Sequence, residues 1–486
     1  MSKLVNLGAC ELSRLIRSRQ VLCVEVMQTY LQHIHTHNPS VNAIVSIVDD
    51  AKLMDEASAM DIRLAAGEDV GWMAGFPLAP KDLTATAGIP TTFGAKFLKN
   101  NVPTVDSIVV ERMKKAGAIL IGKTNVPEFG LGSQTYNSVF GTTRNAYDIS
   151  KTCGGSSGGT AVALALRMLP VADGSDLGGS LRNPAAWNNV YGFRPSHGRV
   201  PFGVFKETFL DQMSTEGPMG RSVEDVAMLL SIQAGYDARV PTSLPGSGDE
   251  FSDLGALKIR SFNGCRVGWL GTYGGHVAVD KELLHLSEES LKHFERMGCS
   301  VAEVKPNFDM HALWDAWIKL RSFLFANKCR AFYEIDNCRN EIKPEAIWEI
   351  EKGLSLRADE IYAASETRSA WFQELSRLFE SYDFLVLPST QVFPFGAELQ
   401  WPSHVNGVEM DTYHRWMEIV VGPSMAGVPT LNVPAGFNSA GLPFGFQIIG
   451  RNGNDFGVLQ LGYQWEQFTD FSTRIPPLLG QHDNIE

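Results

Sequence analysis

The sequence predicts an α/β fold in which one large mixed β-sheet is covered by helices on both faces. From Gly75 onward, short strand-like runs (FPLAPK, AILIGK, LPVADG) alternate with helical stretches such as 107–116 and 159–168. Strand-like segments also occur near the C-terminus (LNVPAG, FGFQIIG). Because these segments lie at both ends of the pattern, we expect one sheet to span most of the 486 residues as a single domain.

Helices come first along the chain. Amphipathic patterns predict helices over about residues 8–36 and 50–66, the first ending near Asn38-Pro39 because proline disfavours helix at the residue before it. Residues 310–380 are helical and rich in aromatic side chains, which core packing explains better than a substrate pocket. A buried strand (DFLVLPS) follows, and a helix is predicted near 455–467.

Composition excludes several classes of protein. Hydrophobic residues make up 44% of the chain and charged residues 20%, as in a globular protein with a sizeable core. The 54 acidic residues outnumber the 42 basic ones, and a net charge of -12 disfavours binding to the phosphate backbone of a nucleic acid. The seven cysteines include no C-x-x-C pair, which suits a reducing cytoplasm better than a disulfide framework.

Neither a signal peptide nor a membrane span is expected. The first twenty residues interleave charged and apolar positions and lack an apolar core. The most apolar helix-like stretch, 160–172, is short and contains Arg167. We therefore expect a cytoplasmic protein that does not cross a membrane.

A first glycine-rich segment, CGGSSGGT, contains two overlapping G-x-S-x-G patterns around Ser156 and Ser157. A nucleophile elbow of this form requires a strand directly before the serine, but the preceding NAYDISKT is typical of a loop. A phosphate-binding loop is disfavoured as well, since no Gly-Lys-Ser/Thr follows the glycines.

A second glycine-rich segment, ADGSDLGGSLRNPAAW, favours Ser180 as a nucleophile. The two glycines before Ser180 leave backbone N–H groups unshielded, as an oxyanion hole requires. A predicted helix and strand separate Ser156 from Ser180, so the two loops are expected to meet at one sheet edge.

A serine nucleophile needs a base, and the residues alone leave its identity open. His197 lies in a basic segment, SHGRVP, without an acidic partner nearby. Lys81 is flanked by apolar residues and prolines, and burial would lower the pKa of its amine toward neutrality. A lysine that pairs with Asp82 or extends into solvent remains the simpler interpretation of these residues.

Two further patterns are set aside. The run H-x-H-x-H over His33, His35 and His37 resembles a metal site, but on a helix His35 points away from the other two, and no acidic cluster completes the ligands. Cys153, close to Ser156, is interpreted as a neutral loop cysteine rather than a thiol nucleophile.

The run GGSSGGTAVALALRMLPVADGSDLGGSLRNPA, residues 154–185, satisfies a known signature at every constrained position. On this run the protein resembles the amidase signature family of serine hydrolases. Similarity extends to PLAPKDLTATAGIPTTFGA, GAILIGKTNVPEFG, GFRPSHGRVP, STEGPMGRSVEDVA and PSMAGVPTLNVPAGFNSAGLPFGFQIIG. The similarity to the family is weaker between about residues 235 and 410.

The resemblance implies a Ser-Ser-Lys catalytic set on the amidase signature fold. Carried over to this sequence, Ser180 is the nucleophile, Ser156 the proton relay and Lys81 the base, with a cis peptide bond between Gly155 and Ser156. The implied oxyanion hole consists of the N–H groups of Leu177, Gly178, Gly179 and Ser180.

Supporting roles also follow from the resemblance. Ser157 is expected to hydrogen-bond near the catalytic groups, and Asp176 and Arg182 to hold the loop through an ion pair. Residues 75–235 would form the catalytic core and 236–410 a variable substrate-pocket region. The implied mechanism needs no metal and no organic cofactor.

The expected function is hydrolysis of a small-molecule carboxylic amide, with an apolar or aryl group, by a stand-alone enzyme. The segment WNNVYGFRPSHGRVP resembles stand-alone bacterial amidases more than amidotransferase subunits. Two alternatives stay open: the glutamine-hydrolysing subunit of a tRNA amidotransferase complex, and an esterase or carbamate (urethane) hydrolase on the same fold. The expected partner is the amide substrate, without nucleic acid or membrane; the oligomeric state is open and includes a homodimer.

Overall fold

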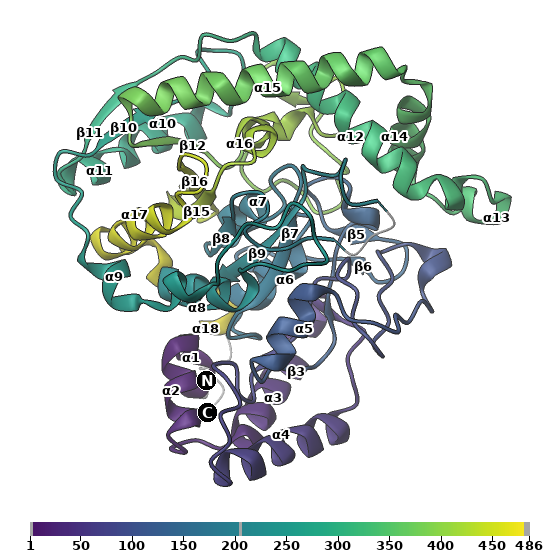
Figure 1. Cartoon of the computed structure of the whole chain (residues 1–486), viewed down its shortest axis with the longest axis vertical. Coiled ribbons are helices and arrows are strands. Elements are labelled where there is room, and N and C mark those ends of the chain that lie inside the picture. The colour runs from purple at the N-terminus through teal and green to yellow at the C-terminus, as the bar shows by residue number, and fades with distance from the viewer. Residues whose placement is uncertain (1–2, 204–206, 481–486) are drawn as a thin grey trace.

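The computed structural model describes residues 3–203 and 207–480. Within them a mixed eight-stranded sheet is flanked by helices, which confirms the predicted α/β class (Figure 1). In spatial order the strands are β11 (Ser300–Glu303), β10 (Arg266–Trp269), β12 (Phe384–Pro388), β16 (Pro443–Ile449), β15 (Thr430–Phe437), β8 (Tyr191–Arg194), β9 (Thr215–Gly220) and β7 (Ala172–Asp176). Strand β10 runs parallel to both of its neighbours, and the other pairs are antiparallel.

Strand β12 shows why the central strands are apolar throughout. All five of its residues, FLVLP, are buried. Leu385 and Leu387 pack into one hydrophobic cluster, whereas Phe384 and Val386 pack into another. Since alternate residues of a strand point to opposite faces, both faces of the sheet carry a core.

Helices cover the sheet and form both ends of the molecule. Figure 1 shows α1–α4 and both termini at one end, and α12, α14 and α15 at the other. The helices are α1 (Lys3–Asn6), α2 (Ala9–Arg17), α3 (Cys23–Val41), α4 (Asp50–Ala65), α5 (Ile108–Lys115), α6 (Gly158–Ala165), α7 (Arg182–Trp187), α8 (Val223–Gln233), α9 (Leu254–Ile259), α10 (Lys281–Ser290), α11 (Lys292–Arg296), α12 (Met310–Tyr333), α13 (Asp336–Arg339), α14 (Pro344–Ser355), α15 (Ala358–Ser381), α16 (Val421–Ala426), α17 (Asp455–Phe468) and α18 (Pro477–Gly480).

The prediction for the first helix was wrong in two respects. The chain leaves the helical path after α2, where Arg19 adopts a left-handed conformation with φ 57°, and re-enters it at α3. Helix α3 then continues through Pro39 to Val41. A proline so close to the end of a helix removes a single backbone hydrogen bond, and the helix stops at Asn42, where φ is 54°.

The expectation that one sheet spans most of the chain holds only between Ala172 and Ile449. The runs FPLAPK and AILIGK form short pairs outside the main sheet, since Pro77 and Pro80 lack the N–H groups that a longer ladder requires. The short strands are β1 (Ile44–Val45), β2 (Pro77–Leu78), β3 (Ile119–Leu120), β4 (Lys123–Thr124), β5 (Tyr136–Asn137), β6 (Gly141–Thr142), β13 (His404–Val405) and β14 (Val408–Glu409).

Helix α6 is buried along its whole length and carries the first glycine-rich segment into the core. Its small residues allow this close packing: a side chain at Gly159 would lie 2.4 Å from the backbone N of Asn125. The aromatics of 310–380 are divided: Trp314, Trp317, Trp371 and Phe379 pack in the interior, others are half-buried, and Tyr362 is exposed.

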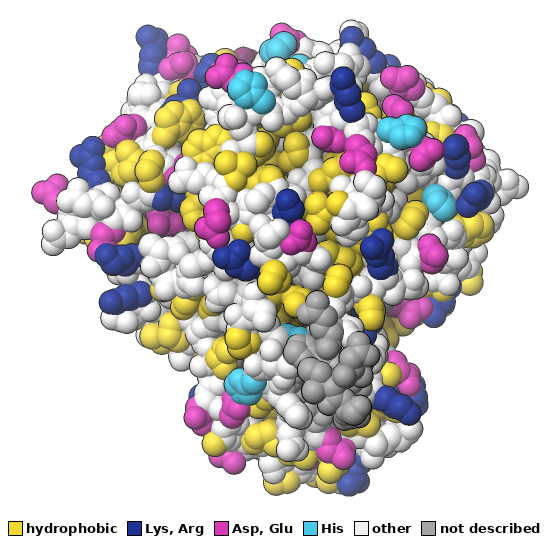
Figure 2. All heavy atoms as spheres, turned by 180° about the vertical axis from the view of Figure 1, so that it is seen from behind, with side chains coloured by type: hydrophobic (Ala, Val, Ile, Leu, Met, Phe, Trp, Pro, Cys, Tyr) yellow, Lys and Arg dark blue, Asp and Glu magenta, His cyan; other side chains and the backbone are white. Residues whose placement is uncertain are grey.

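The surface carries charged side chains of both signs, as the 42 basic and 54 acidic residues of the sequence lead us to expect. Figure 2 shows acidic and basic side chains interspersed over the back face, with apolar side chains exposed between them. In the part of the chain that the structure describes, no helix is both long enough and apolar enough to cross a membrane.

Candidate active site

The two glycine-rich loops meet as predicted. One loop leads into α6 and carries Ser156 and Ser157, and the other joins β7 to α7 and carries Ser180. The backbone N–H of Ser157 donates to the carbonyl of Ser180 at 3.2 Å. The peptide bond between Gly155 and Ser156 is cis, which confirms that expectation, and the Gly155 carbonyl accepts a hydrogen bond from Ser133 Oγ at 2.7 Å.

Lys81 reaches this junction from the segment after β2. Its side chain is completely buried. The Nζ lies 2.8 Å from Ser156 Oγ and 2.9 Å from Ser157 Oγ. Two further contacts join it to Ser175, at 3.0 Å to the hydroxyl and 3.1 Å to the carbonyl. All four of these contacts are made with neutral oxygens, so no described group in direct contact requires the amine to be charged.

Burial lowers the pKa of Lys81 to about 7, against the opposing influence of Asp176, Asp173 and Glu216. A substantial fraction of the amine is therefore neutral near pH 7, and a neutral amine can accept a proton. The carboxylate of Asp82 is engaged elsewhere, accepting from the N–H and hydroxyl of Thr92. The simple pairing of Lys81 with Asp82 is therefore absent from the structure.

Ser180 lies between β7 and α7 and is 8% exposed. Within the described residues its hydroxyl makes no hydrogen bond, including none to Ser156. Hydrogen bonds of this kind are commonly long in a substrate-free site and tighten when the substrate binds. The structure thus joins Lys81 to Ser156 directly, whereas the contact between Ser156 and Ser180 has yet to form.

The loop before Ser180 differs from expectation at one position. The N–H of Gly179 donates to Asp176 Oδ1 at 2.8 Å, so this group is not available to an oxyanion in this conformation. The N–H groups of Leu177, Gly178 and Ser180 find no acceptor in the described parts of the chain. The reason for the difference is that Asp176 captures two loop amides, the second being that of Leu181 at 3.0 Å.

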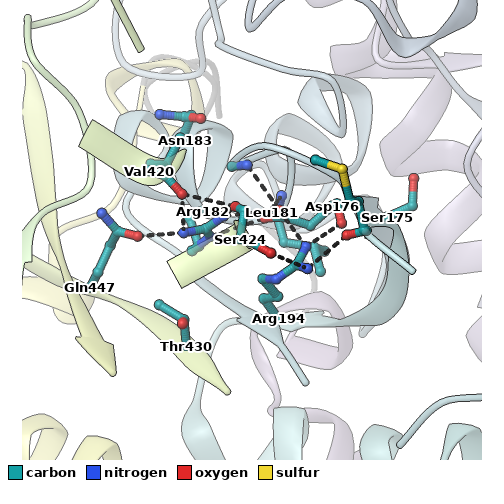
Figure 3. A network of polar contacts seen from close by, with 12 residues as sticks. Ser175, Asp176, Leu181, Arg182, Asn183, Arg194, Val420, Ser424, Thr430 and Gln447 are labelled. Carbon is teal, nitrogen blue, oxygen red and sulfur yellow. Dashed lines mark hydrogen bonds and ion pairs between the residues drawn. The ribbon is translucent and has the colours of Figure 1, made fainter. Parts of the chain in front are cut away.

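Asp176 is the centre of a buried ionic network (Figure 3). Its Oδ1 lies 2.9 Å from Arg182 Nη2 and 3.0 Å from Arg194 Nη1, and all three side chains are inaccessible to solvent. Burial opposes ionisation of Asp176, but the two guanidinium groups outweigh it and hold the pKa of the carboxyl well below its usual range. Arg182 also donates to Val420 O and Ser424 Oγ, which ties the loop to α16 and the segment before it.

An aromatic side chain borders the same loop. Trp317 on α12 is buried, and a side chain at Gly178 would come within 3.1 Å of its indole. The indole is stacked on Trp314, with ring centroids 4.9 Å apart, and the guanidinium of Arg321 lies 5.0 Å from its ring. The helices of residues 310–380 therefore place one apolar surface directly at the site.

Several groups at the site were not foreseen from the sequence. Ser175 contacts Lys81, and Arg194 shares Asp176 with Arg182. The alternation of ADGSD in β7 could have indicated that Ser175 and Asp176 face different partners. For Arg194, eighteen residues beyond Asp176, no local pattern gives a signal.

The residues set aside lie apart from this chemistry. Burial lowers the pKa of His197 to about 4 and raises that of the Cys153 thiol to about 12, so neither group is prepared to act as a base or thiolate. The imidazoles of His33 and His35 contact Leu166 O and Asp50 respectively. Across residues 3–203 and 207–480, no group of three His, Cys, Asp or Glu side chains is arranged to hold a metal ion.

Comparison with known proteins identifies the family. The model of the family described as Amidase matches residues 25–459. The chain belongs to the amidase family. A curated family member, a Glutamyl-tRNA(Gln) amidotransferase subunit from Ralstonia nicotianae, is 32% identical over 96% of this chain and 98% of its own length.

Solved structures of the family agree. A bacterial aryl acylamidase of the amidase signature family has a TM-score of 0.91 and 30% identity over 97% of this chain and 98% of its own. The corresponding Glutamyl-tRNA(Gln) amidotransferase subunit from Thermotoga maritima has a TM-score of 0.77 and 26% identity over 96% of each chain. Like the family, this protein is a hydrolase that acts on C–N amide bonds.

Proposed function

We propose that this protein hydrolyses its amide through an acyl-enzyme on Ser180, with Ser156 as proton relay and Lys81 as base. The observation that carries the proposal is the contact between Lys81 Nζ and Ser156 Oγ at 2.8 Å, made by a lysine with no exposed surface. Such a lysine is held in the protonation range that general-base catalysis at neutral pH requires.

In the acylation step, Ser180 Oγ attacks the amide carbonyl carbon while its proton passes to Ser156 Oγ and the Ser156 proton passes to Lys81 Nζ. The carbonyl oxygen becomes an oxyanion, which we assign to the free N–H groups of the loop at Leu177, Gly178 and Ser180. The C–N bond then breaks, and the relay runs backwards to deliver the proton to the leaving nitrogen.

Deacylation uses the same groups. Water attacks the ester carbonyl and gives a proton through Ser156 to Lys81. Collapse of the second tetrahedral intermediate breaks the bond to Ser180 Oγ, which recovers its proton from the relay. The products are a carboxylic acid and ammonia or an amine.

Two substrates are candidates, and the curated relatives favour the one treated above as an alternative. Eight relatives, each 32–34% identical to this chain, are all Glutamyl-tRNA(Gln) amidotransferase subunits of the same type. By this similarity the chain would release ammonia from glutamine beside partner subunits. The expectation of a stand-alone enzyme rests instead on the segment after Ser180.

A specific observation supports the second candidate, an aryl or apolar amide. The indole of Trp317 borders Gly178 beside the proposed oxyanion hole, where it offers an apolar contact to an acyl or leaving group. The similarity to the aryl acylamidase, at TM-score 0.91, agrees with this candidate.

One experiment separates the candidates. The purified chain would be assayed alone for glutamate release from glutamine and for nitroaniline release from p-nitroacetanilide, with its oligomeric state measured by gel filtration. Turnover of p-nitroacetanilide without glutaminase activity supports the stand-alone enzyme, as monomer or homodimer. Glutaminase activity that requires added partner subunits supports the amidotransferase function. If a fluorophosphonate fails to label Ser180, that result contradicts the mechanism common to both candidates.

A further inference from the structure

A second buried lysine lies beside Lys81, although the proposed mechanism does not use it. Lys123 belongs to β4, where the next residue, Thr124, forms a parallel bridge with Lys81. The Lys123 side chain has no exposed surface. Its Nζ donates to the carbonyl of Thr84 at 2.5 Å and to Thr86 Oγ1 at 2.7 Å. Lys123 therefore fastens the segment that leads away from Lys81.

Two buried carboxyl groups share this interior with both lysines. Asp173 on β7 is completely buried, and Glu216 on β9 is 4% exposed. Asp173 Oδ2 accepts the backbone N–H of Lys81 at 3.3 Å and the Thr84 hydroxyl at 3.4 Å. Its Oδ1 has no hydrogen-bond partner among the residues described. One carboxylate oxygen beside the Lys81 segment is therefore uncommitted.

The other acidic groups nearby already have their own partners. Asp176 faces Lys81 but pairs with two arginines, and Asp82 faces Lys123 but accepts from Thr92. Burial raises the pKa of Glu216 to about 8, so this carboxyl is largely uncharged near pH 7. Among the described residues, Asp173 is therefore the carboxyl group here that keeps one oxygen without a hydrogen-bond partner.

Lys123 is suited to balance the charge of Asp173. Burial raises the pKa of Asp173, and the largest opposing influence is the ammonium of Lys123. Burial lowers the pKa of Lys123 to about 8, which leaves it mostly charged at pH 7. Lys123 is therefore the cation of this interior that most favours the charged form of Asp173, and a charged Asp173 in turn favours a charged Lys81.

We propose that Lys123 is a positioning residue for Lys81, an inference that rests on the proposed function. Through Thr84 and Thr86, Lys123 fixes the segment that carries Lys81. Its positive charge stabilises the charged form of Asp173. Without Lys123, Lys81 is the remaining lysine whose positive charge favours the charged form of Asp173. A protonated Lys81 is unable to accept the proton from Ser156.

The test follows the rate of Ser180 labelling by a fluorophosphonate as a function of pH, because this reaction requires no knowledge of the substrate. In Lys123→Met, the midpoint of the rise with pH should move upward by about one unit or more, so that labelling at pH 7 falls about fivefold or more and recovers at alkaline pH. The double variant Lys123→Met/Asp173→Asn, which lacks both charges, should return the midpoint toward that of the wild type.

Lys343→Met is the matched control. Lys343 is also partly buried, and its Nζ also donates to a backbone carbonyl, that of Leu131 at 2.8 Å. The charged groups that influence its pKa do not include Lys81 or Asp173. This control should keep the wild-type midpoint. A Lys123→Met profile that keeps its midpoint, or falls by the same factor at every pH, overturns the proposal.

A second variant covers the case in which Lys123→Met does not fold. Asp173→Asn alone, with Lys123 retained, should move the midpoint to lower pH because a carboxylate that favours charged Lys81 is gone. An unchanged midpoint again overturns the inference. Lys81→Ala tests the proposed function separately, since undiminished labelling of that variant would reject Lys81 as the base whatever the Lys123 variants do.

Discussion

Lys81 Nζ and Ser156 Oγ lie 2.8 Å apart, although 75 residues separate them in the sequence. The contact is buried, and the groups around the amine are hydroxyls and a carbonyl rather than carboxylates. A lysine in these surroundings can lose its proton near neutral pH. Ser157, which Lys81 also contacts, donates its backbone N–H to the carbonyl of Ser180.

The rate of amide hydrolysis should increase with pH through about 7. Lys81 acts as a base only when neutral, and because its folded-state pKa is lowered to about 7, the neutral fraction grows as the pH passes that value. Lys81→Ala should lose about 10²–10⁴-fold in acylation rate. Lys81→Arg should not restore it, since guanidinium keeps its proton. An arginine variant with nearly wild-type activity in a steady-state assay would remove Lys81 from the mechanism.

Ser180→Ala should abolish both hydrolysis and labelling by a fluorophosphonate, with the fold intact. The hydroxyl makes no hydrogen bond within the described structure, so its removal leaves no buried partner unsatisfied. Mass spectrometry of the labelled wild-type protein locates the modified residue, and thermal unfolding checks the fold. A label on Ser156 or Ser157 would instead support a nucleophile elbow.

Ser156→Ala should reduce the hydrolysis of an amide more than that of an activated ester. An amine leaving group needs the proton that the relay returns, whereas p-nitrophenolate leaves without one. The comparison of kcat/KM for p-nitroacetanilide and p-nitrophenyl acetate measures the difference. Equal losses of kcat/KM on the two substrates would argue that Ser156 only supports the loop. In the wild-type enzyme, a preference for the ester that exceeds the ester's greater intrinsic reactivity would favour the esterase alternative.

Asp176→Asn should destabilise the protein by about 3–5 kcal/mol, because it leaves the guanidinium groups of Arg182 and Arg194 buried with less compensating charge. Urea unfolding measures the change. The comparison is Arg239→Ala at the exposed ion pair with Glu111, 2.7 Å long, which should cost no more than about 1 kcal/mol. Similar values for the two variants would mean that the buried network contributes no more than a surface pair.

Chelators should leave activity unchanged. The proposed proton path runs between Ser180, Ser156 and Lys81, and the run of His33, His35 and His37 belongs to α3, away from these groups. Steady-state rates before and after dialysis against EDTA or phenanthroline provide the check. Loss of activity that added zinc restores would contradict the proposal.

The sequence predicted the fold class and the meeting of the two glycine-rich loops because both depend on local patterns. Strand and helix runs indicate the layers, and the spacing of Ser156 and Ser180 leaves room for one helix and one strand between them. Lys81 was different. From its neighbours alone, pairing with Asp82 was the simpler interpretation, and only the family resemblance favoured a base.

What the sequence did not predict depends on contacts between distant segments. Nothing near Lys123 indicates that Asp173, fifty residues later, shares its surroundings. The capture of the Gly179 N–H by Asp176 depends on how the loop closes, which no pattern in ADGSDLGGS specifies. The assignment of 75–235 as catalytic core and 236–410 as substrate region stays a prediction.

Strand β7 brings the lysine and the loop of Ser180 to one element of the sheet. Its adjacent residues Ser175 and Asp176 contact Lys81 and the loop of Ser180, respectively. A single short strand therefore aligns the reacting groups. The helices that reach the site from residues 310–381 meet that loop from outside. We therefore expect that exchange of the outer helices alters which molecule is cleaved while the pH dependence of cleavage is retained.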